Sequence, residues 1–200
     1  MNDIRKERTR ELYIDITCCI IRQQGIKGVT IRSISEKAGY NSATLYSYFS
    51  NLSELIFCAH MKFENELVDI FNKEIENVRS LYSIWPRMYS VMYEYYLENP
   101  YLFDCIIEND YAASQKADLK DQWTSASSLY AFVQDKLEKI SLETDKDISL
   151  INKINDICLA QVTGSVLLTL KRRNFPDSVQ TRKTLEDNIS KIIKCFTEGV

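Results

Sequence analysis

The 200-residue sequence has few residues that interrupt helices, with only five glycines and three prolines. It also lacks the Asn-Gly and Asp-Gly pairs that mark tight β-hairpins. These absences favour a chain that is nearly all helix. Its apolar runs fall far short of the roughly 20 residues that cross a bilayer. The charged start, MNDIRKERTR, is unlike a signal peptide, so we expect a cytoplasmic protein without membrane contact.

Motifs of catalysis and metal binding are also scarce. His60 is the only histidine, which excludes the Glu-x-x-His pairs of a di-iron helical bundle. The sequence has no glycine-rich phosphate loop, nucleophile elbow or zinc motif. We therefore expect neither an enzyme nor a bound metal or cofactor.

The cysteines show no Cys-x-x-Cys or zinc-ligand spacing. Most of them occupy apolar helical positions, where cysteine packs as a small hydrophobic residue. A redox-sensing regulator stays open as an alternative, because reactive thiols can be oxidised selectively. The six cysteines are Cys18, Cys19, Cys58, Cys105, Cys158 and Cys195.

Charge is divided unevenly along the chain. Eight basic and five acidic side chains within residues 1–50 give that segment a net charge of +3. The whole chain has a net charge of −3, so the remaining 150 residues carry −6. A basic N-terminal segment followed by an acidic remainder is expected when only one end of a protein contacts the phosphates of a nucleic acid.

Residues 28–51 carry the pattern of a helix-turn-helix, whose second helix can enter the major groove of DNA. Thr30 can cap the first helix. Gly39 follows where the chain must leave that helix with positive φ, which glycine adopts without steric cost. Asn41 or Ser42 then caps the second helix.

The second helix is short and polar on its outer side. Leu45 and Phe49 point inward at i, i+4, which leaves hydroxyl and aromatic groups facing outward. Such a surface suits a groove of DNA, although a helical hairpin that merely exposes its polar face to water has the same spacing. The outward residues are Ser42, Ala43, Thr44, Tyr46, Ser47 and Tyr48.

From about Thr9 to Met61 the chain resembles the DNA-binding domain of the tetracycline-repressor (TetR) family of bacterial regulators. The matching pattern is G-x-x-x-x-T-I-R-x-I-S-x-x-A-G over residues 25–39, followed by Thr44-Leu45-Tyr46, Tyr48-Phe49 and Ser53-Glu54-Leu55. This pattern covers about a quarter of the chain. The resemblance implies a DNA-binding transcriptional repressor that recognises a palindromic operator as a homodimer.

The resemblance also implies which residues hold DNA. Thr30, Tyr46 and Tyr48 match positions that contact DNA, often through phosphates. Positions that can approach bases match Arg32, Ser42, Ala43, Thr44 and Ser47. Arg32 is the strongest candidate for direct recognition of a base, because its guanidinium group can donate two hydrogen bonds to O6 and N7 of one guanine.

Two positions depart from the family pattern. The family commonly has a lysine at the place of Leu52, where it reaches a phosphate, and a histidine at the place of Tyr48. Leucine cannot bind phosphate in this way. We therefore expect phosphate anchoring to shift to the N-terminal arm, which contains Arg5, Lys6, Arg8 and Arg10.

The expected fold is all-α. A three-helix, helix-turn-helix DNA-binding domain over residues 1–52 is joined through a long helix to a helical effector-binding and dimerisation domain over residues 53–200. Helices are also expected from Pro86 to Asn99, from about residue 148 to 173 and from about residue 179 to 197.

Apolar stripes follow the last two of these helices. Each stripe belongs either to the core of one chain or to a contact with a second subunit. The resemblance favours the second alternative, because TetR-family proteins dimerise through their last two helices. The expected interface residues are Val162, Gly164, Val166, Ile189, Ile192, Ile193 and Phe196.

The stretch from residue 81 to 111 is rich in tyrosine, with acidic residues between the aromatic ones. Such a set can line a pocket for a partly apolar, small-molecule effector, and a carboxylate there would favour a cation. Tyrosines that straddle the surface beside solvated acids would give the same pattern. The expected lining residues are Trp85, Tyr89, Tyr93, Glu94, Tyr96, Phe103, Ile107, Glu108 and Tyr130.

A helical adaptor that has lost specific DNA binding is a further alternative. The expected recognition helix carries no lysine or arginine of its own. Retention on nucleic acid that moderate salt abolishes would separate a repressor from such an adaptor.

Overall fold

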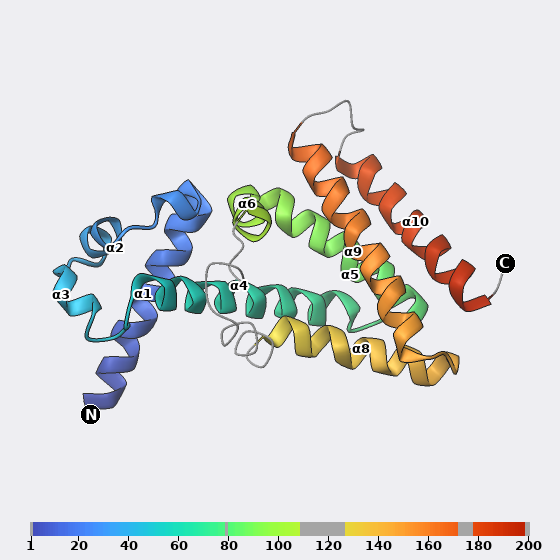
Figure 1. Cartoon of the computed structure of the whole chain (residues 1–200), viewed down its shortest axis with the longest axis horizontal. Helices are drawn as coiled ribbons and strands as arrows, with labels where there is room; N and C mark the ends of the chain where they lie inside the picture. Colours follow the sequence, from blue (N-terminus) through green and yellow to red (C-terminus); the bar gives the residue numbers. More distant parts are fainter. Residues whose placement is uncertain (1, 79, 109–126, 172–177, 199–200) are drawn as a thin grey trace. The chain divides into compact units, whose positions relative to one another are not determined.

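The computed structural model describes residues 2–78, 80–108, 127–171 and 178–198. Within these ranges the regular structure consists of α-helices and one 3-10 helix, so the expected all-α class is confirmed (Figure 1). None of the helices in the described ranges has the length and hydrophobicity needed to cross a membrane.

The chain divides into two compact units. The first unit comprises Met1–Asn65 and Asn99–Ser127, and the second comprises Glu66–Glu98 and Ser128–Val200. The division falls inside one continuous helix, so the separation of a DNA-binding domain at residue 52 stays a prediction.

In its described residues, the first unit contains five elements and the beginning of a sixth. They are α1 (Asn2–Gln24), η1 (Ile26–Gly28), α2 (Ile31–Ala38), α3 (Ser42–Leu45), the first part of α4 (Leu52–Ile75) and α6 (Pro100–Glu108). The second unit contains the rest of α4, with α5 (Leu81–Glu98), α8 (Ser128–Thr144), α9 (Ile148–Leu170) and α10 (Ser178–Glu198).

Helix α1 supplies much of the core of the first unit. Helical periodicity predicts Leu12 as an inward residue, but it is 40% exposed, whereas neighbouring Tyr13 is fully buried. The sequence allowed both choices, because apolar residues lie on more than one side of α1. The side chains that α1 buries are Tyr13, Ile14, Thr17, Cys18, Ile20 and Ile21.

Helices α1 and α4 are tied by contacts at both buried and exposed positions. The thiol of Cys18 donates to the carbonyl of Ala59 at 3.7 Å. At the surface, Nζ of Lys62 lies 2.5 Å from Asp15 Oδ1 and 3.3 Å from Glu11 Oε2. The beginning of α4 is thereby fixed to α1.

The core of the second unit forms where α5, α9 and α10 pack against one another. Helix α9 buries Ile151, Ile154, Cys158, Val162 and Val166. Helix α10 adds Leu185, Ile189 and Ile193. Ion pairs surround this core: Arg87 joins Glu74 and Glu186, while Arg182 joins Glu94 and Glu186.

Two helix boundaries differ from the sequence expectation. Helix α5 begins at Leu81, five residues before Pro86, so the proline lies inside the helix, where its missing N–H removes one intrahelical hydrogen bond. The sequence pattern predicts a break from residue 141 to 146, but helix α8 continues through Ser141 to Thr144, and the chain then turns at Asp145 with φ 51°. Aspartate tolerates this left-handed backbone better than most residues.

Candidate nucleic-acid interface

Helix α2 is closed at both ends by local chemistry, as the sequence predicts. Thr30 Oγ1 accepts from the backbone N–H of Ser33, and Ser33 Oγ accepts from the backbone N–H of Thr30, both at 3.0 Å. This reciprocal arrangement is a capping box. At the other end Gly39 has φ 70°, a left-handed conformation that favours glycine.

Helix α3 begins at the cap provided by Asn41, whose Oδ1 accepts from the backbone N–H of Thr44 at 2.9 Å. The α-helix spans four residues instead of the seven expected. After Leu45 the chain continues as a tight turn, in which the backbone N–H groups of Ser47 and Tyr48 bond three residues back. Leu45 and Phe49 are buried, as expected.

The residues predicted to contact DNA all retain accessible surface. The exposed members are Thr30, Arg32, Ser42, Ala43, Tyr46 and Ser47, and the half-buried ones are Thr44 and Tyr48. These eight residues, here named the reading surface, come from the start of α2, from α3 and from the turn after it. Their contacts with DNA stay a prediction.

A cluster of aromatic rings supports the reading surface from within the first unit. The ring centroid of Tyr13 lies 6.1 Å from that of Tyr40, 5.8 Å from that of Tyr48 and 6.3 Å from that of Phe49. Burial raises the pKa of Tyr13, and the nearby Tyr40 and Tyr48 add to the shift. The role of Tyr13 was not predictable from the sequence, because no local pattern indicates that its ring packs against Tyr40, almost 30 residues away.

The N-terminal arm does not offer all of its charges to DNA. Arg10 lies over the ring of Phe49, with 5.1 Å between Cζ and the ring centroid. Its Nη2 also donates to Cys58 Sγ at 3.1 Å. Arg10 is therefore engaged within the unit, whereas Arg5, Lys6 and Arg8 are exposed on α1.

The start of α4 is also capped. Asn51 Oδ1 accepts from the backbone N–H of Glu54 at 2.8 Å, and Glu54 Oε2 accepts from that of Ser50 at 2.7 Å. Ser53 is also a residue type that caps helices, but Asn51 performs this role here. Leu52 is therefore the first residue of α4, and the capping bonds of Asn51 and Glu54 fix the geometry of this helix start.

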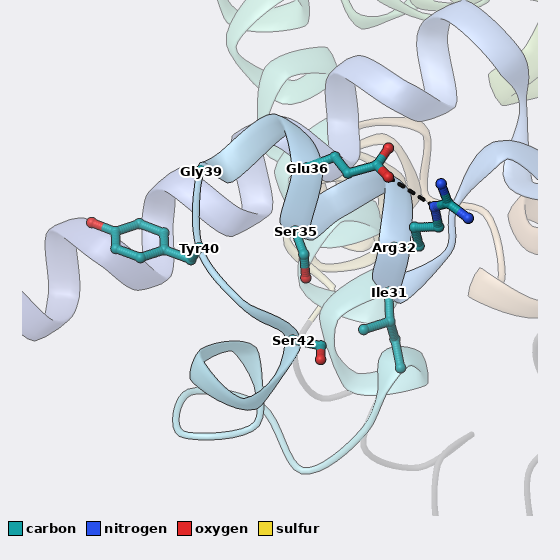
Figure 2. A pocket seen from close by; sticks show the side chains of 7 residues that line it. All are labelled: Ile31, Arg32, Ser35, Glu36, Gly39, Tyr40 and Ser42. Carbon is teal, nitrogen blue, oxygen red and sulfur yellow. Dashed lines mark hydrogen bonds and ion pairs between the residues drawn. The ribbon is translucent and has the colours of Figure 1, made fainter.

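Between α2 and the start of α3 lies an open depression of about 610 Å³. It is lined by Ile31, Arg32, Ser35, Glu36, Gly39, Tyr40 and Ser42. Figure 2 shows Arg32 and Glu36 joined on one side of α2, while Tyr40 extends away from them. Arg32 Nε donates to Glu36 Oε1 at 2.8 Å.

Most of the predicted effector residues are packed in the core. Trp85, Tyr89, Tyr93 and Tyr96 of α5 are buried in the second unit. Phe103 is buried in α6, which belongs to the first unit. The lining set is thus drawn from both units.

Several polar groups of that set are already engaged. The Tyr89 hydroxyl donates to Asn155 Oδ1 at 2.5 Å, and the Tyr93 hydroxyl shares a hydrogen bond of 3.0 Å with Thr169. The carboxylate of Glu94 pairs with Arg182, so a cationic ligand there would displace an internal partner.

Three residues of the predicted effector set remain: Tyr130, Ile107 and Glu108. Tyr130 on α8 is 43% exposed. The side chains of Ile107 and Glu108 lie outside the described residues, although α6 includes both positions.

The predicted interface residues fall into two groups. Val162, Val166, Ile189 and Ile193 are buried within a single chain, which is the alternative that the sequence left open. A side chain with almost no exposed area offers little to a second subunit, so these four are core residues. The other three keep accessible surface: Gly164, Ile192 and Phe196.

Residues 14–57 match the family model described as bacterial regulatory proteins, tetR family. The matched segment contains the capped α2, the Gly39 turn, α3 and the start of α4. No curated protein sequence matches the chain.

Solved structures share its fold at low identity. A tetR-family transcriptional regulator from Streptomyces coelicolor has a TM-score of 0.69 and 16% identity, covering 97% of this chain and 84% of that one. FadR from Bacillus subtilis, in complex with stearoyl-CoA, has a TM-score of 0.65 and 11% identity, covering 95% and 98%. A transcriptional regulator from Saccharomonospora viridis, in complex with choline, has a TM-score of 0.67 and 14% identity, covering 92% and 96%. Residues 14–57 are therefore similar to the DNA-binding segment of tetR-family regulators, and the chain shares the fold of these solved structures.

Proposed function

We propose that this protein is a ligand-responsive transcriptional repressor, which acts in the bacterial cytoplasm and binds a palindromic operator as a homodimer. The observation that carries the proposal is the reading surface. Its polar side chains are accessible, while Leu45 and Phe49 of the same segment are buried in the core. A surface built this way leaves Arg32 and Tyr46 available to DNA without loss of core packing.

Arg32 is assigned to base recognition, and Thr30, Tyr46 and Tyr48 to phosphates. Arg32→Ala is expected to lower the preference for the selected operator over random DNA by about tenfold or more. The measurement is a gel-shift titration on an operator selected from a randomised duplex library. The matched control is Lys73→Ala, which removes an exposed positive charge from the second unit.

Unchanged affinity and sequence preference in Arg32→Ala would contradict this assignment. If the wild-type chain shows no DNA retention that moderate salt abolishes, the adaptor alternative replaces the repressor.

The homodimer is supported by apolar surface on the outer side of α9. Ile157, Leu159, Leu167 and Leu168 are between 36% and 43% exposed, and an added Cβ at Gly164 would meet nothing within 4 Å. Large exposed apolar side chains on one helix can contribute to an interaction site on a protein surface. Two copies of the reading surface would also read enough bases for useful specificity.

Gly164→Ala tests the dimer. In an isolated chain the substitution fits and raises helix propensity by about 1 kcal/mol. Where a second copy packs closely against α9, the added methyl group weakens association. Sedimentation equilibrium is expected to show weaker dimers but more stable monomers, and equal or tighter dimers would contradict close packing at this glycine.

Control by a small molecule is supported by α4, which contributes residues to both units, and by the ligand-bound relatives. A ligand that favours one arrangement of α4 lowers DNA affinity through coupling of a few kcal/mol. Native mass spectrometry of protein purified from cells would reveal a retained ligand. Thermal-shift screening of acyl compounds, lipophilic cations and aromatic acids would follow, and hits that leave DNA affinity unchanged would refute the switch.

A further inference from the structure

Arg32 and Glu36 form an exposed pair one helical turn apart on α2. The Nε–H of Arg32 donates to Glu36 Oε1 at 2.8 Å, and the two side chains are 87% and 62% exposed. In Figure 2 the marked bond to Glu36 starts from Nε of Arg32, and neither terminal nitrogen carries a marked bond to Glu36. One edge of the guanidinium is therefore held, while its end stays open to solvent.

Stabilisation of α2 does not explain this pair. The helix has only eight residues, with Arg32 in its first turn and Glu36 in its second half. A helix favours acidic side chains near its start and basic ones near its end, and an acid–base pair works best with the acid first. Both residues have the unfavourable placement, so a requirement outside the helix is the better explanation.

The held edge has a consequence for base recognition. Guanine O6 and N7 accept two parallel hydrogen bonds from an arginine. When Glu36 engages Nε, the Nη1 and Nη2 groups of Arg32 remain for that contact. An arginine that is already oriented also loses less conformational freedom on binding.

We propose that Glu36 is a positioning residue, which orients Arg32 toward one guanine and thereby sharpens the preference for a G·C pair at that point of the operator. The inference rests on the proposed function of DNA recognition. The carboxylate has a second effect, because its negative charge offsets that of Arg32 and reduces attraction to phosphates of any sequence.

The test compares full-length wild type with Glu36→Ala, Glu36→Gln, Arg32→Ala and the Arg32→Ala, Glu36→Ala double variant. Each is titrated with the selected operator, with operators changed at single base pairs and with a random duplex. Glu138→Ala is the matched control, since it removes one exposed carboxylate from α8.

Glu36→Ala is expected to tighten binding to random DNA and to lower the preference for the guanine by about threefold to tenfold, the cost of immobilising a long side chain. Glu36→Gln keeps an acceptor oxygen without the charge, so it should tighten random binding while keeping most of the preference. In the Arg32→Ala background, Glu36→Ala should leave the preference unchanged.

Three outcomes would overturn the inference. An equal change in affinity for every duplex on Glu36→Ala would reduce Glu36 to a simple charge. An effect of Glu36→Ala on preference that persists in the Arg32→Ala background would remove the link between the two residues. A stronger preference in Glu36→Ala would show that Glu36 restrains Arg32 from DNA. In each case wild type still selects an operator, whereas wild type without any preference would refute the proposed function itself.

Discussion

Tyr46 of the reading surface and the buried tyrosines of α5 lie in opposite environments. Tyr46 is 51% exposed in the first unit. In the second unit Tyr93 is fully buried, and both its hydroxyl and that of Tyr89 bond to side chains of α9. The same residue type thus serves packing in the second unit and, in the function proposed above, recognition in the first, and the accessibility of the hydroxyl separates the two uses.

The largest effect is expected in the buried set. Tyr93→Ala removes a fully buried ring and should lower the free energy of unfolding by about 3–5 kcal/mol. Urea unfolding followed by circular dichroism measures the change. A loss below about 1 kcal/mol would show that α5 packs loosely around this position.

Tyr46→Ala is the converse experiment on the exposed set. Its side chain is half exposed, so the free energy of unfolding should change by no more than about 0.5 kcal/mol. Operator affinity should fall by about tenfold through loss of a hydrogen bond to a charged phosphate. Fluorescence anisotropy on labelled operator measures this, and unaltered affinity would remove Tyr46 from the reading surface.

A smaller effect is expected from Tyr89→Phe, which deletes only the hydroxyl bonded to Asn155. The free energy of unfolding at pH 7 should fall by about 1 kcal/mol. Burial raises the pKa of Tyr89, so above about pH 10 the unfolded wild type ionises while the folded protein does not. This linkage destabilises wild type as pH rises, and the difference between the two proteins should shrink. A difference that grows at high pH would contradict the buried, neutral hydroxyl.

The smallest effect is expected from thiol labelling. Cys195 is exposed, whereas Cys158 is buried and burial raises the pKa of its thiol to about 12. An alkylating reagent at pH 8 should modify Cys195 first, leave Cys158 intact until unfolding, and change the free energy of unfolding by no more than about 0.5 kcal/mol. Mass spectrometry of digested protein identifies the sites. Rapid modification of Cys58 with loss of DNA binding would instead favour the redox alternative.

The helix-turn-helix was predictable because its determinants are local. Thr30, Gly39 and Asn41 act within four residues of their own positions, through capping bonds and one left-handed backbone. The long α4, the all-α class and the family resemblance followed from the same kind of signal.

The partners of apolar and aromatic side chains were not predictable in this way. Helical periodicity identifies an apolar stripe but not what covers it, so Val162 and Ile189 were assigned to a subunit contact although they are core residues. The hydroxyl of Tyr89 bonds a residue 66 positions away, and no local pattern encodes such a distance. The tyrosine-rich stretch therefore does not show by itself whether its side chains line a pocket, and the effector pocket stays a prediction.

The capping bonds of the first unit have a consequence for how the protein changes over evolutionary time. The bonds that shape α2, α3 and the start of α4 come from Thr30, Ser33, Asn41, Asn51 and Glu54. Ser42, Ala43 and Ser47 are exposed, and the framework does not depend on their side chains. Mutations at these three sites are therefore nearly neutral for folding. Under the proposed function, a duplicated copy of the gene can therefore acquire a new operator by drift at those sites while its folding stays intact.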